Sequence, residues 1–221
     1  MRQRRSAPAS GSAPDLAVLE QVYRLHVGAN GVAADDPAAA PGALAAIART
    51  HRQEAAHRAD AEPVVTTSAP PTGGRLFDVI TDEMPFAVES LLAGLDRAGA
   101  RVRQVVHPVV TVRRDKFGDL VEVLVPGETQ PGSSAELWIR IEVDPVPADE
   151  AEELADELRT VLRDVRDVAL DQQDMVEVAR AVACELRGTR QPGTPATDVE
   201  DAARLVEWLV DGRLALLGYR R

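Results

Sequence analysis

The sequence is poor in aromatic side chains and in cysteine. Aromatic residues make up 3% of the 221 residues while 45% are hydrophobic, so a core has to be built mainly from Val, Leu, Ile and Ala. Cys184 is the only cysteine. A single cysteine excludes an internal disulfide and a zinc site made of several thiolates, and it suits a reducing compartment.

Long apolar runs are also missing. No stretch approaches the roughly 18 apolar residues that a membrane span needs. The basic start MRQRR is followed by small and polar residues, not by the apolar run of a signal peptide. We therefore expect a cytoplasmic protein without a membrane partner.

Positive charge is scarce. The chain has 25 Lys and Arg against 36 Asp and Glu, a formal net charge of −11, and such a surface repels phosphate backbones. We therefore expect no nucleic acid partner. The acidic residues between 149 and 157 are spread around a predicted helix, with no loop to gather them, so the sequence predicts no metal site.

Composition and periodicity divide the chain into four parts. Residues 1–14 are small and polar and are expected to form a disordered tail. Residues 15–74 form a helical lead-in, with helices expected near 15–27 and 43–59. Residues 75–187 form the main domain. Residues 188–221 combine a linker, a helix opening with a Thr197–Glu200 capping box, and the start of a truncated following segment.

The main domain alternates strands and helices in a recognisable order. The pattern predicts a strand at 75–80, a helix from Pro85 to Gly99, a strand run at 102–114, a turn at 115–119, strands at 120–125 and 137–144, and a long acidic helix from 148. Three consecutive strands favour antiparallel pairing. The fold class is therefore α+β, a two-layer sandwich with an antiparallel four-stranded sheet, helices on one face and additional flanking helices.

The strand at 137–144 has the clearest alternation. Leu137, Ile139, Ile141 and Val143 point to the core, while Trp138 lies on the opposite side, which we interpret as exposed. Cys184 falls on an apolar helical stretch and is interpreted as a small core residue.

Two motifs in the main domain carry a resemblance to a known family. The first is made of Thr81, Asp82, Met84, Pro85, Phe86, Val88 and Ser90, and the second of His107, Pro108, Val112, Arg113, Arg114 and Asp115. Both resemble the first ACT-like segment of the large bacterial NAD-specific glutamate dehydrogenases. Tyr23, His26, the run THRQEAAHR (50–58) and the ending WLVDGRLALLGYR (208–220) are similar to the same family, so the resemblance covers about residues 15–221.

The resemblance implies an ACT-like (ferredoxin-like) fold and a non-catalytic, N-terminal regulatory or assembly module. The parent enzymes convert glutamate to 2-oxoglutarate and ammonia with NAD, in a catalytic domain beyond this region. This chain has no GxGxxG after a strand, so we expect no cofactor and no catalytic residue here, with NAD bound elsewhere in the parent. The expected partners are sister modules of the same polypeptide or other copies in a homo-oligomer. The alternative is a purely structural oligomerisation scaffold with no ligand, using Trp138 on the exposed side.

The turn at 82–86 is the sharpest candidate for a ligand site. Asp82 or Glu83 could hold the ammonium group of an amino-acid effector, and backbone N–H groups at the following helix start could take its carboxylate. The structural alternative is that Asp82 caps the helix while Met84, Pro85 and Phe86 form its hydrophobic start.

Three further residues are candidates for binding. His107 is either a ligand or proton-transfer group, or a hydrogen-bonded and partly buried structural residue beside Pro108. Arg113 and Arg114, with the sole lysine Lys116, either bind an anion or pair with the acidic helix at 149–157.

Overall fold

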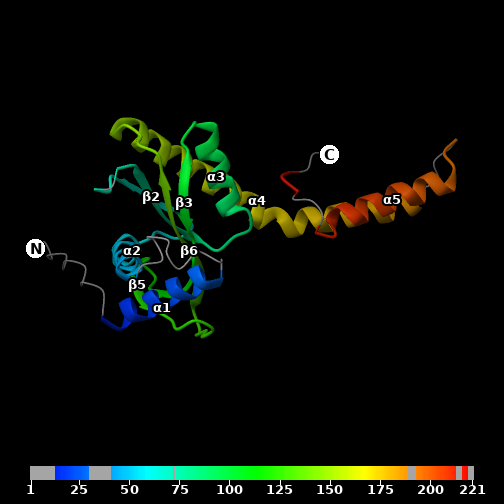
Figure 1. Cartoon of the computed structure of the whole chain (residues 1–221). Helices are drawn as coiled ribbons and strands as arrows, with labels where there is room; N and C mark the ends of the chain where they lie inside the picture. Colours follow the sequence, from blue (N-terminus) through cyan, green and yellow to red (C-terminus); the bar gives the residue numbers. More distant parts are fainter. Residues whose placement is uncertain (1–12, 30–40, 72, 189–192, 213–215, 219–221) are drawn as a thin grey trace, which may run out of the picture. The chain divides into compact units, whose positions relative to one another are not determined.

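A six-stranded antiparallel sheet forms the centre of the first of two compact units, Met1–Arg163 and Asp164–Arg221 (Figure 1). The computed structural model describes residues 13–29, 41–71, 73–188, 193–212 and 216–218. The strands are β1 (Val64–Ser68), β2 (Arg75–Asp82), β3 (Val102–Val106), β4 (Val109–Arg114), β5 (Leu120–Val123) and β6 (Ser133–Val143).

Strand β6 is the centre of the sheet. The order is β1-β2-β6-β4-β5, and β3 also pairs with β6. Pro108 cannot donate a ladder hydrogen bond, and it divides the run at 102–114 into β3, which pairs with residues 140–143, and β4, which pairs with residues 133–137. The alternation of β6 sends its side chains to both faces of the sheet.

One face of the sheet is covered by α3 (Ala87–Arg97) and by the first part of α4 (Ala148–Gly188). We call it the α3–α4 face. Its core is apolar, and the side chains that the sheet contributes include Phe77, Val79, Ile139 and Ile141. Helix α3 ends where the sequence predicts, because Gly99 adopts a left-handed φ of 74° just after the last turn.

The opposite face, the α1–α2 face, is covered by the lead-in helices α1 (Ala13–Ala29) and α2 (Pro41–Glu54). Apolar side chains of both helices pack on the sheet, among them Leu19, Leu44 and Ile47. Trp138 from β6 lies among them and is 0% exposed, so the prediction of an exposed Trp138 was wrong. The tryptophan is buried because the lead-in helices cover the face onto which it projects.

The predicted antiparallel, ACT-like α+β class is confirmed. The details differ in two respects, because the sheet has six strands where four were predicted and helices cover both faces instead of one. Residues 60–74 belong to the predicted helical lead-in, but the β-branched residues VVTT (64–67) form β1 along the edge of β2. The predicted domain boundaries stay a prediction, although the lead-in helices and the sheet lie in one compact unit.

The second unit contains the remainder of α4 and helix α5 (Ala196–Val210). Arg187 forms ion pairs with Glu200 and Glu207. The predicted capping box was wrong, because Pro195 is the N-cap and the Thr197 hydroxyl bonds to the Asp198 carboxylate. Cys184 is exposed, so its assignment to the core was also wrong.

Two predicted segments lie largely outside the described residues, namely the tail at 1–14 and the segment after Gly212. Within the described ranges, no helix has the length and apolar character needed to cross a membrane.

Candidate functional site

The α1–α2 face contains charged side chains that the fold removes from water. They come from the lead-in helices, from the segment after α2 and from the strands. Two groups of them are joined by hydrogen bonds. We call these the Glu136 cluster (Arg58, Asp82, Arg114, Glu136 and Trp138) and the Asp78 cluster (Tyr23, His51, Asp78 and Arg140).

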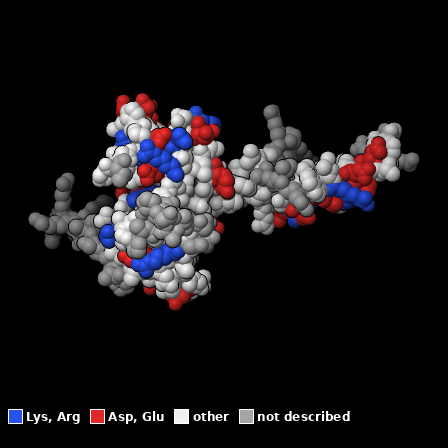
Figure 2. Space-filling view, viewed as in Figure 1, with Lys and Arg blue, Asp and Glu red and all other residues white. Residues whose placement is uncertain are grey.

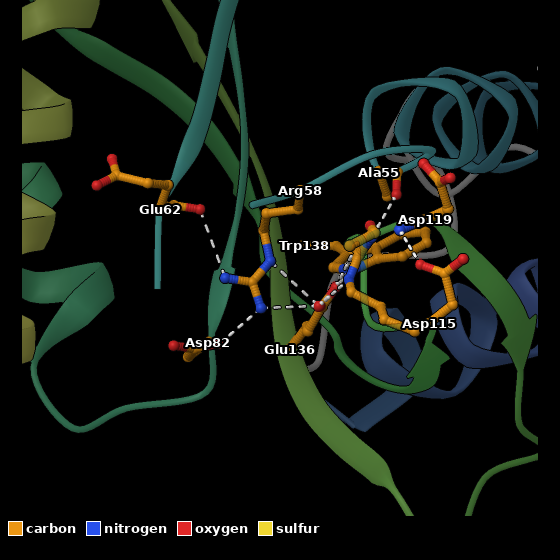
Figure 3. Close-up of polar contacts among 10 residues, drawn as sticks. Ala55, Arg58, Glu62, Asp82, Asp115, Asp119, Glu136 and Trp138 are labelled. Atoms are coloured by element: carbon orange, nitrogen blue, oxygen red, sulfur yellow. Dashed lines mark hydrogen bonds and ion pairs between the residues drawn. The ribbon is translucent and has the colours of Figure 1, made fainter. Parts of the chain in front are cut away.

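Glu136 is the centre of the first cluster (Figure 3). Its side chain is 0% exposed and accepts hydrogen bonds from both guanidinium groups, with Arg58 Nη2 at 2.9 Å and Arg114 Nε at 2.7 Å from Oε1. The indole Nε1 of Trp138 donates to Oε2 at 2.9 Å. Burial by itself raises the pKa of Glu136, but Arg114 and Arg58 together lower it below its ordinary value. The carboxylate is therefore ionised and fully bonded.

The same cluster joins the lead-in to the sheet. Arg58 follows α2 in the chain, and its Nη2 also donates to Asp82 at 2.6 Å, at the end of β2. Arg114 extends from β4 and donates through Nη1 to the carbonyl oxygens of Ala55 and Gly118, both at 2.9 Å. The two guanidinium groups thus join the lead-in segment, the end of β2, β6 and the turn between β4 and β5.

The Asp78 cluster lies under the lead-in helices. His51 Nε2 lies 2.8 Å from Asp78 Oδ1, and the hydroxyl of Tyr23 bonds to His51 Nδ1. Arg140 completes the cluster with a bidentate contact to Asp78, at 2.7 and 2.9 Å. Because Asp78 accepts at Nε2 and Tyr23 donates to Nδ1, the geometry suits a neutral His51.

The pKa shifts in the Asp78 cluster agree with this assignment. Burial lowers the pKa of His51, and Asp78 offsets only part of the effect. Burial also raises the pKa of Tyr23 well above its ordinary value, and the Asp78 carboxylate adds to the rise. For Asp78 itself, burial raises the pKa but hydrogen bonds from His51 and Arg140 bring it below the ordinary value. The cluster holds one anion and one cation at neutral pH.

A third contact attaches α1 to the edge of the sheet. Asp15 accepts from Arg52 Nε and Nη2, both at 3.2 Å, and from the backbone N–H of Val123 at 3.4 Å. The backbone N–H of Leu120 donates to the Ala56 carbonyl at 2.9 Å. The outer side of β5 is therefore bonded to the lead-in, which protects an edge that would otherwise be open to another strand.

The structure separates the predicted ligand residues of the turn at 82–86. Asp82 pairs with Arg58 and does not cap α3, whose N-cap is Phe86 with no side-chain hydrogen bond, so the capping interpretation was wrong. Met84 packs against the apolar core of the α3–α4 face, while Glu83, Pro85 and Phe86 are exposed. An amino-acid site at this turn stays a prediction.

His107 lies on the other side of β6 from that turn. Its backbone N–H donates to His26 Nε2 at 3.2 Å, and the two imidazole rings meet edge to face with centroids 4.7 Å apart. Partial burial and the neighbouring His107 lower the pKa of His26 to about 4. The structure therefore uses His107 to hold the end of α1.

The two predicted anion-binding arginines are paired inside the first unit. Arg113 bonds to Glu122 across β4 and β5 at 3.1 Å, and Arg114 bonds to Glu136. The expected pairing with the acidic helix at 149–157 was wrong, because these strand carboxylates are closer. Anion binding stays a prediction.

Sequence reasoning missed the central residues of both clusters, Arg58, Glu136, His51 and Asp78. A weak signal was present. Asp78 interrupts the apolar run RLFDVI, and Arg140 interrupts the strand LWIRIEV. A charged residue in the middle of a buried strand requires a partner, but the sequence does not identify that partner.

Comparisons with known proteins show which family this fold and these clusters belong to. The sequence pattern of the family described as glutamate dehydrogenase, ACT1 domain, matches residues 26–158, which include both clusters apart from Tyr23. The chain is 36% identical over 143 residues to an NAD-specific glutamate dehydrogenase of Halomonas elongata, and 30% identical over 143 residues to the protein of that name in Pseudomonas aeruginosa. Both alignments cover 64% of this chain.

A third relative is the NAD-specific glutamate dehydrogenase of Mycobacterium tuberculosis, 28% identical over 175 residues and 77% of this chain. The aligned regions are a small part of these relatives. They span 9% of the first two and 11% of the third.

Proposed function

Since the chain belongs to the family of the glutamate dehydrogenase ACT1 domain, we propose that it is the N-terminal regulatory or assembly module of a large, cytoplasmic NAD-dependent glutamate dehydrogenase. The module does not itself transfer hydride. It acts by packing against sister modules of the same polypeptide or against other copies. In the parent, glutamate oxidation and NAD binding belong to other domains.

The observation that carries the proposal is the family match over residues 26–158 together with the way the buried polar groups are used. Glu136, Asp78 and His51 each bond to other groups of the chain. The sole lysine, Lys116, lies exposed in the turn between β4 and β5, with its Nζ 4.9 Å from the centre of the Phe117 ring. These side chains support a structural role for the clusters.

The surface charge also supports protein partners over nucleic acid. Figure 2 shows Lys and Arg side chains next to Asp and Glu on the visible face of the molecule, without one continuous basic area. A nucleic-acid surface gathers positive charge on one face.

An NAD-coupled absorbance assay tests the non-catalytic role. The purified 221-residue chain is expected to form no NADH from glutamate, in parallel with an intact glutamate dehydrogenase as a positive control. Glutamate-dependent NADH formation by the purified chain would overturn the proposal.

The regulatory half of the proposal places an amino-acid effector at the turn of residues 82–86. Calorimetric titration with a panel of amino acids tests it, with Asp82→Asn as the matched variant. Binding that weakens in the variant supports the effector. Absence of heat from every amino acid at millimolar concentration removes the regulatory half and leaves the assembly role.

A purely structural scaffold is the second candidate, and one observation favours it. Asp82, the carboxylate best placed to hold an ammonium group, is already bonded to Arg58 at 2.6 Å. An effector would have to displace a guanidinium group whose side chain is only 6% exposed.

A further inference from the structure

Two residues other than glycine have a left-handed backbone among the residues that the structure describes. Ala61 has a φ of 64° and Phe86 has a φ of 65°. For a residue with a Cβ, this conformation lowers the folding equilibrium constant about five- to thirtyfold, because the Cβ approaches the following carbonyl oxygen. Such strain persists only where the surrounding structure imposes it. Its cause should therefore lie in contacts next to these two residues.

Both strained residues lie close in sequence to one ion pair. Ala61 follows Arg58 in the lead-in, and Phe86 follows Asp82 in the turn 82–86. Arg58 Nη2 donates to Asp82 Oδ1 at 2.6 Å, across 24 positions of the sequence. Figure 3 shows the Arg58 guanidinium group pointing toward Asp82. One contact therefore joins the two strained parts of the chain.

On the lead-in side, the backbone around Ala61 is bent back toward Arg58. Arg58 Nη1 donates to the carbonyl oxygen of Glu62 at 3.4 Å, and the backbone N–H of Glu62 donates to the Ala59 carbonyl at 3.2 Å. The Glu62 carboxylate accepts from Arg163 Nη2 at 2.8 Å, where both side chains are about half exposed. The guanidinium group that holds Asp82 thus also holds the carbonyl that follows Ala61.

On the turn side, the chain is fixed on opposite faces of the sheet. Asp82 bonds to Arg58 on the α1–α2 face, whereas Met84 packs against the apolar core of the α3–α4 face. Between them, the backbone N–H of Glu83 donates to the Ala135 carbonyl at 3.1 Å. Phe86 then begins α3 as an N-cap that has no side-chain hydrogen bond. We attribute its left-handed backbone to the short path between these fixed points and the start of the helix.

The turn is open to solvent, and the lead-in end of the ion pair is not. Pro85 and Phe86 are exposed, and the Asp82 side chain is 30% exposed against 6% for Arg58. A change at the exposed part of the turn therefore reaches Asp82 first. Arg58 would transmit it to the lead-in, since its backbone N–H and its side chain both bond within the α1–α2 face.

We propose that the Arg58–Asp82 contact couples the lead-in to the turn 82–86 as a strained, two-state element. While the contact is made, it holds Ala61 and Phe86 in left-handed conformations. When it opens, both parts of the chain relax, and the relief of strain offsets part of the lost ion pair. A change that opens one end therefore favours opening at the other. The purpose of the coupling rests on the regulatory half of the proposed function, and the lead-in is the part that responds.

Glycine substitution measures the strain. Glycine adopts a left-handed backbone without the Cβ penalty, so Ala61→Gly should raise the folding equilibrium constant of the full chain about fivefold in urea denaturation. Phe86→Gly should exceed Phe86→Ala by about the same factor, and these two variants lose the same ring. Ala98→Gly is the control, because Ala98 is exposed with a φ of −78°. It should lower the constant about two- to fivefold.

Removal of the ion pair measures the coupling. In an Asp82→Ala background, the gains from glycine at Ala61 and Phe86 should both fall below about twofold, because the two parts of the chain have already relaxed. Glu122→Ala is the matched background, since it removes the carboxylate partner of Arg113 instead. There both gains should stay near fivefold. Asp82→Asn keeps the shape of the side chain without its charge and gives the same comparison in a milder background.

The outcomes separate the coupling from the proposed function. Persistence of either gain in the Asp82 backgrounds overturns the coupling, and so does a loss on Ala61→Gly equal to that on Ala98→Gly. Either result leaves effector binding to its own test. Calorimetric titration without heat removes the effector but does not affect the measured coupling. NADH formation by the isolated chain would remove the non-catalytic role and would likewise leave the glycine gains unchanged.

Discussion

The two faces of the sheet are buried in different ways. The α3–α4 face is packed with apolar side chains such as Phe77, Ile139 and Leu158. The α1–α2 face buries Asp78 and Glu136 among its apolar side chains. Apolar contact stabilises roughly in proportion to area and without direction. Buried ion pairs add little net stability, but breaking one is costly and each fixes a single geometry.

This difference gives the two faces different roles. Both faces contribute apolar burial to folding, and the α3–α4 face does so without a buried charge among its described residues. The α1–α2 face determines where the lead-in helices sit, since Arg58 and Glu136 can meet in only one arrangement although 78 residues separate them. Substitutions on the two faces should therefore differ in kind as well as in size.

The largest effect is expected from Glu136→Ala. The change leaves Arg58 and Arg114, whose side chains are 6% and 11% exposed, without their carboxylate. Leaving a buried charge unpaired costs about 3–5 kcal/mol, which urea denaturation measures as a lower free energy of unfolding. Glu122→Ala removes the surface partner of Arg113 and should cost about 0–1 kcal/mol. Equal losses of unfolding free energy in Glu136→Ala and Glu122→Ala would contradict the distinction between a buried and an exposed ion pair.

Leu158→Ala tests the apolar face. Leu158 is 0% exposed, and its truncation should cost about 2–5 kcal/mol by leaving a cavity. Hydrogen exchange should then accelerate throughout the sheet, whereas Glu136→Ala should accelerate exchange mainly in α1 and α2. The same exchange pattern in both variants would show that the two faces are one cooperative structure.

Gly118→Ala tests the contact between the lead-in and the turn Asp115–Asp119, which joins β4 to β5. Gly118 has a φ of 87°, and a Cβ there would lie 2.1 Å from the Arg58 carbonyl oxygen. Strain and the clash together should cost about 1–3 kcal/mol in thermal or urea unfolding. Gly127→Ala is the matched control, because its φ is also 87° but nothing lies within 4 Å. If Gly118→Ala lowered the free energy of unfolding no more than Gly127→Ala, the lead-in segment would be able to move away from the added Cβ without cost.

The smallest effect concerns pH. His26 has a pKa of about 4 in the fold, below the ordinary value of 6.5, so the unfolded chain binds its proton more tightly. Its contribution to stability is complete above pH 6.5 and is lost as the pH falls toward 4. An NMR titration of the imidazole measures the pKa directly, and His26→Gln should flatten the pH dependence of unfolding between pH 6.5 and 5. A measured pKa near 6.5 would contradict the packing against His107.

The strands and the main helices could be predicted because their signals are local. Leu137, Ile139 and Ile141 recur at a spacing of two, and Gly99 has the left-handed freedom that ends α3. The edge strand β1 was missed because its five residues lie in a segment rich in Pro, Ser and Thr. Trp138 was predicted to be exposed but is buried. Periodicity shows which face of the sheet a side chain occupies, but not what covers that face.

The candidate site was predictable only in part. The motif residues Asp82, His107 and Arg114 were singled out from the sequence, and ligand binding by them stays a prediction. Each bonds to a lead-in residue, namely Arg58, His26 or the carbonyl of Ala55. Local patterns contain no information about partners that lie dozens of residues away.

By itself the sequence determined the antiparallel, ACT-like class and the family, because periodicity, turn residues and two short motifs are properties of neighbouring positions. Only the tertiary structure decided that the lead-in helices cover the second face of the sheet. It also decided that Trp138 and Glu136 are buried and that Phe117 is exposed. The physical reason is that burial and ion pairing depend on distances between remote segments, which are set when the chain packs.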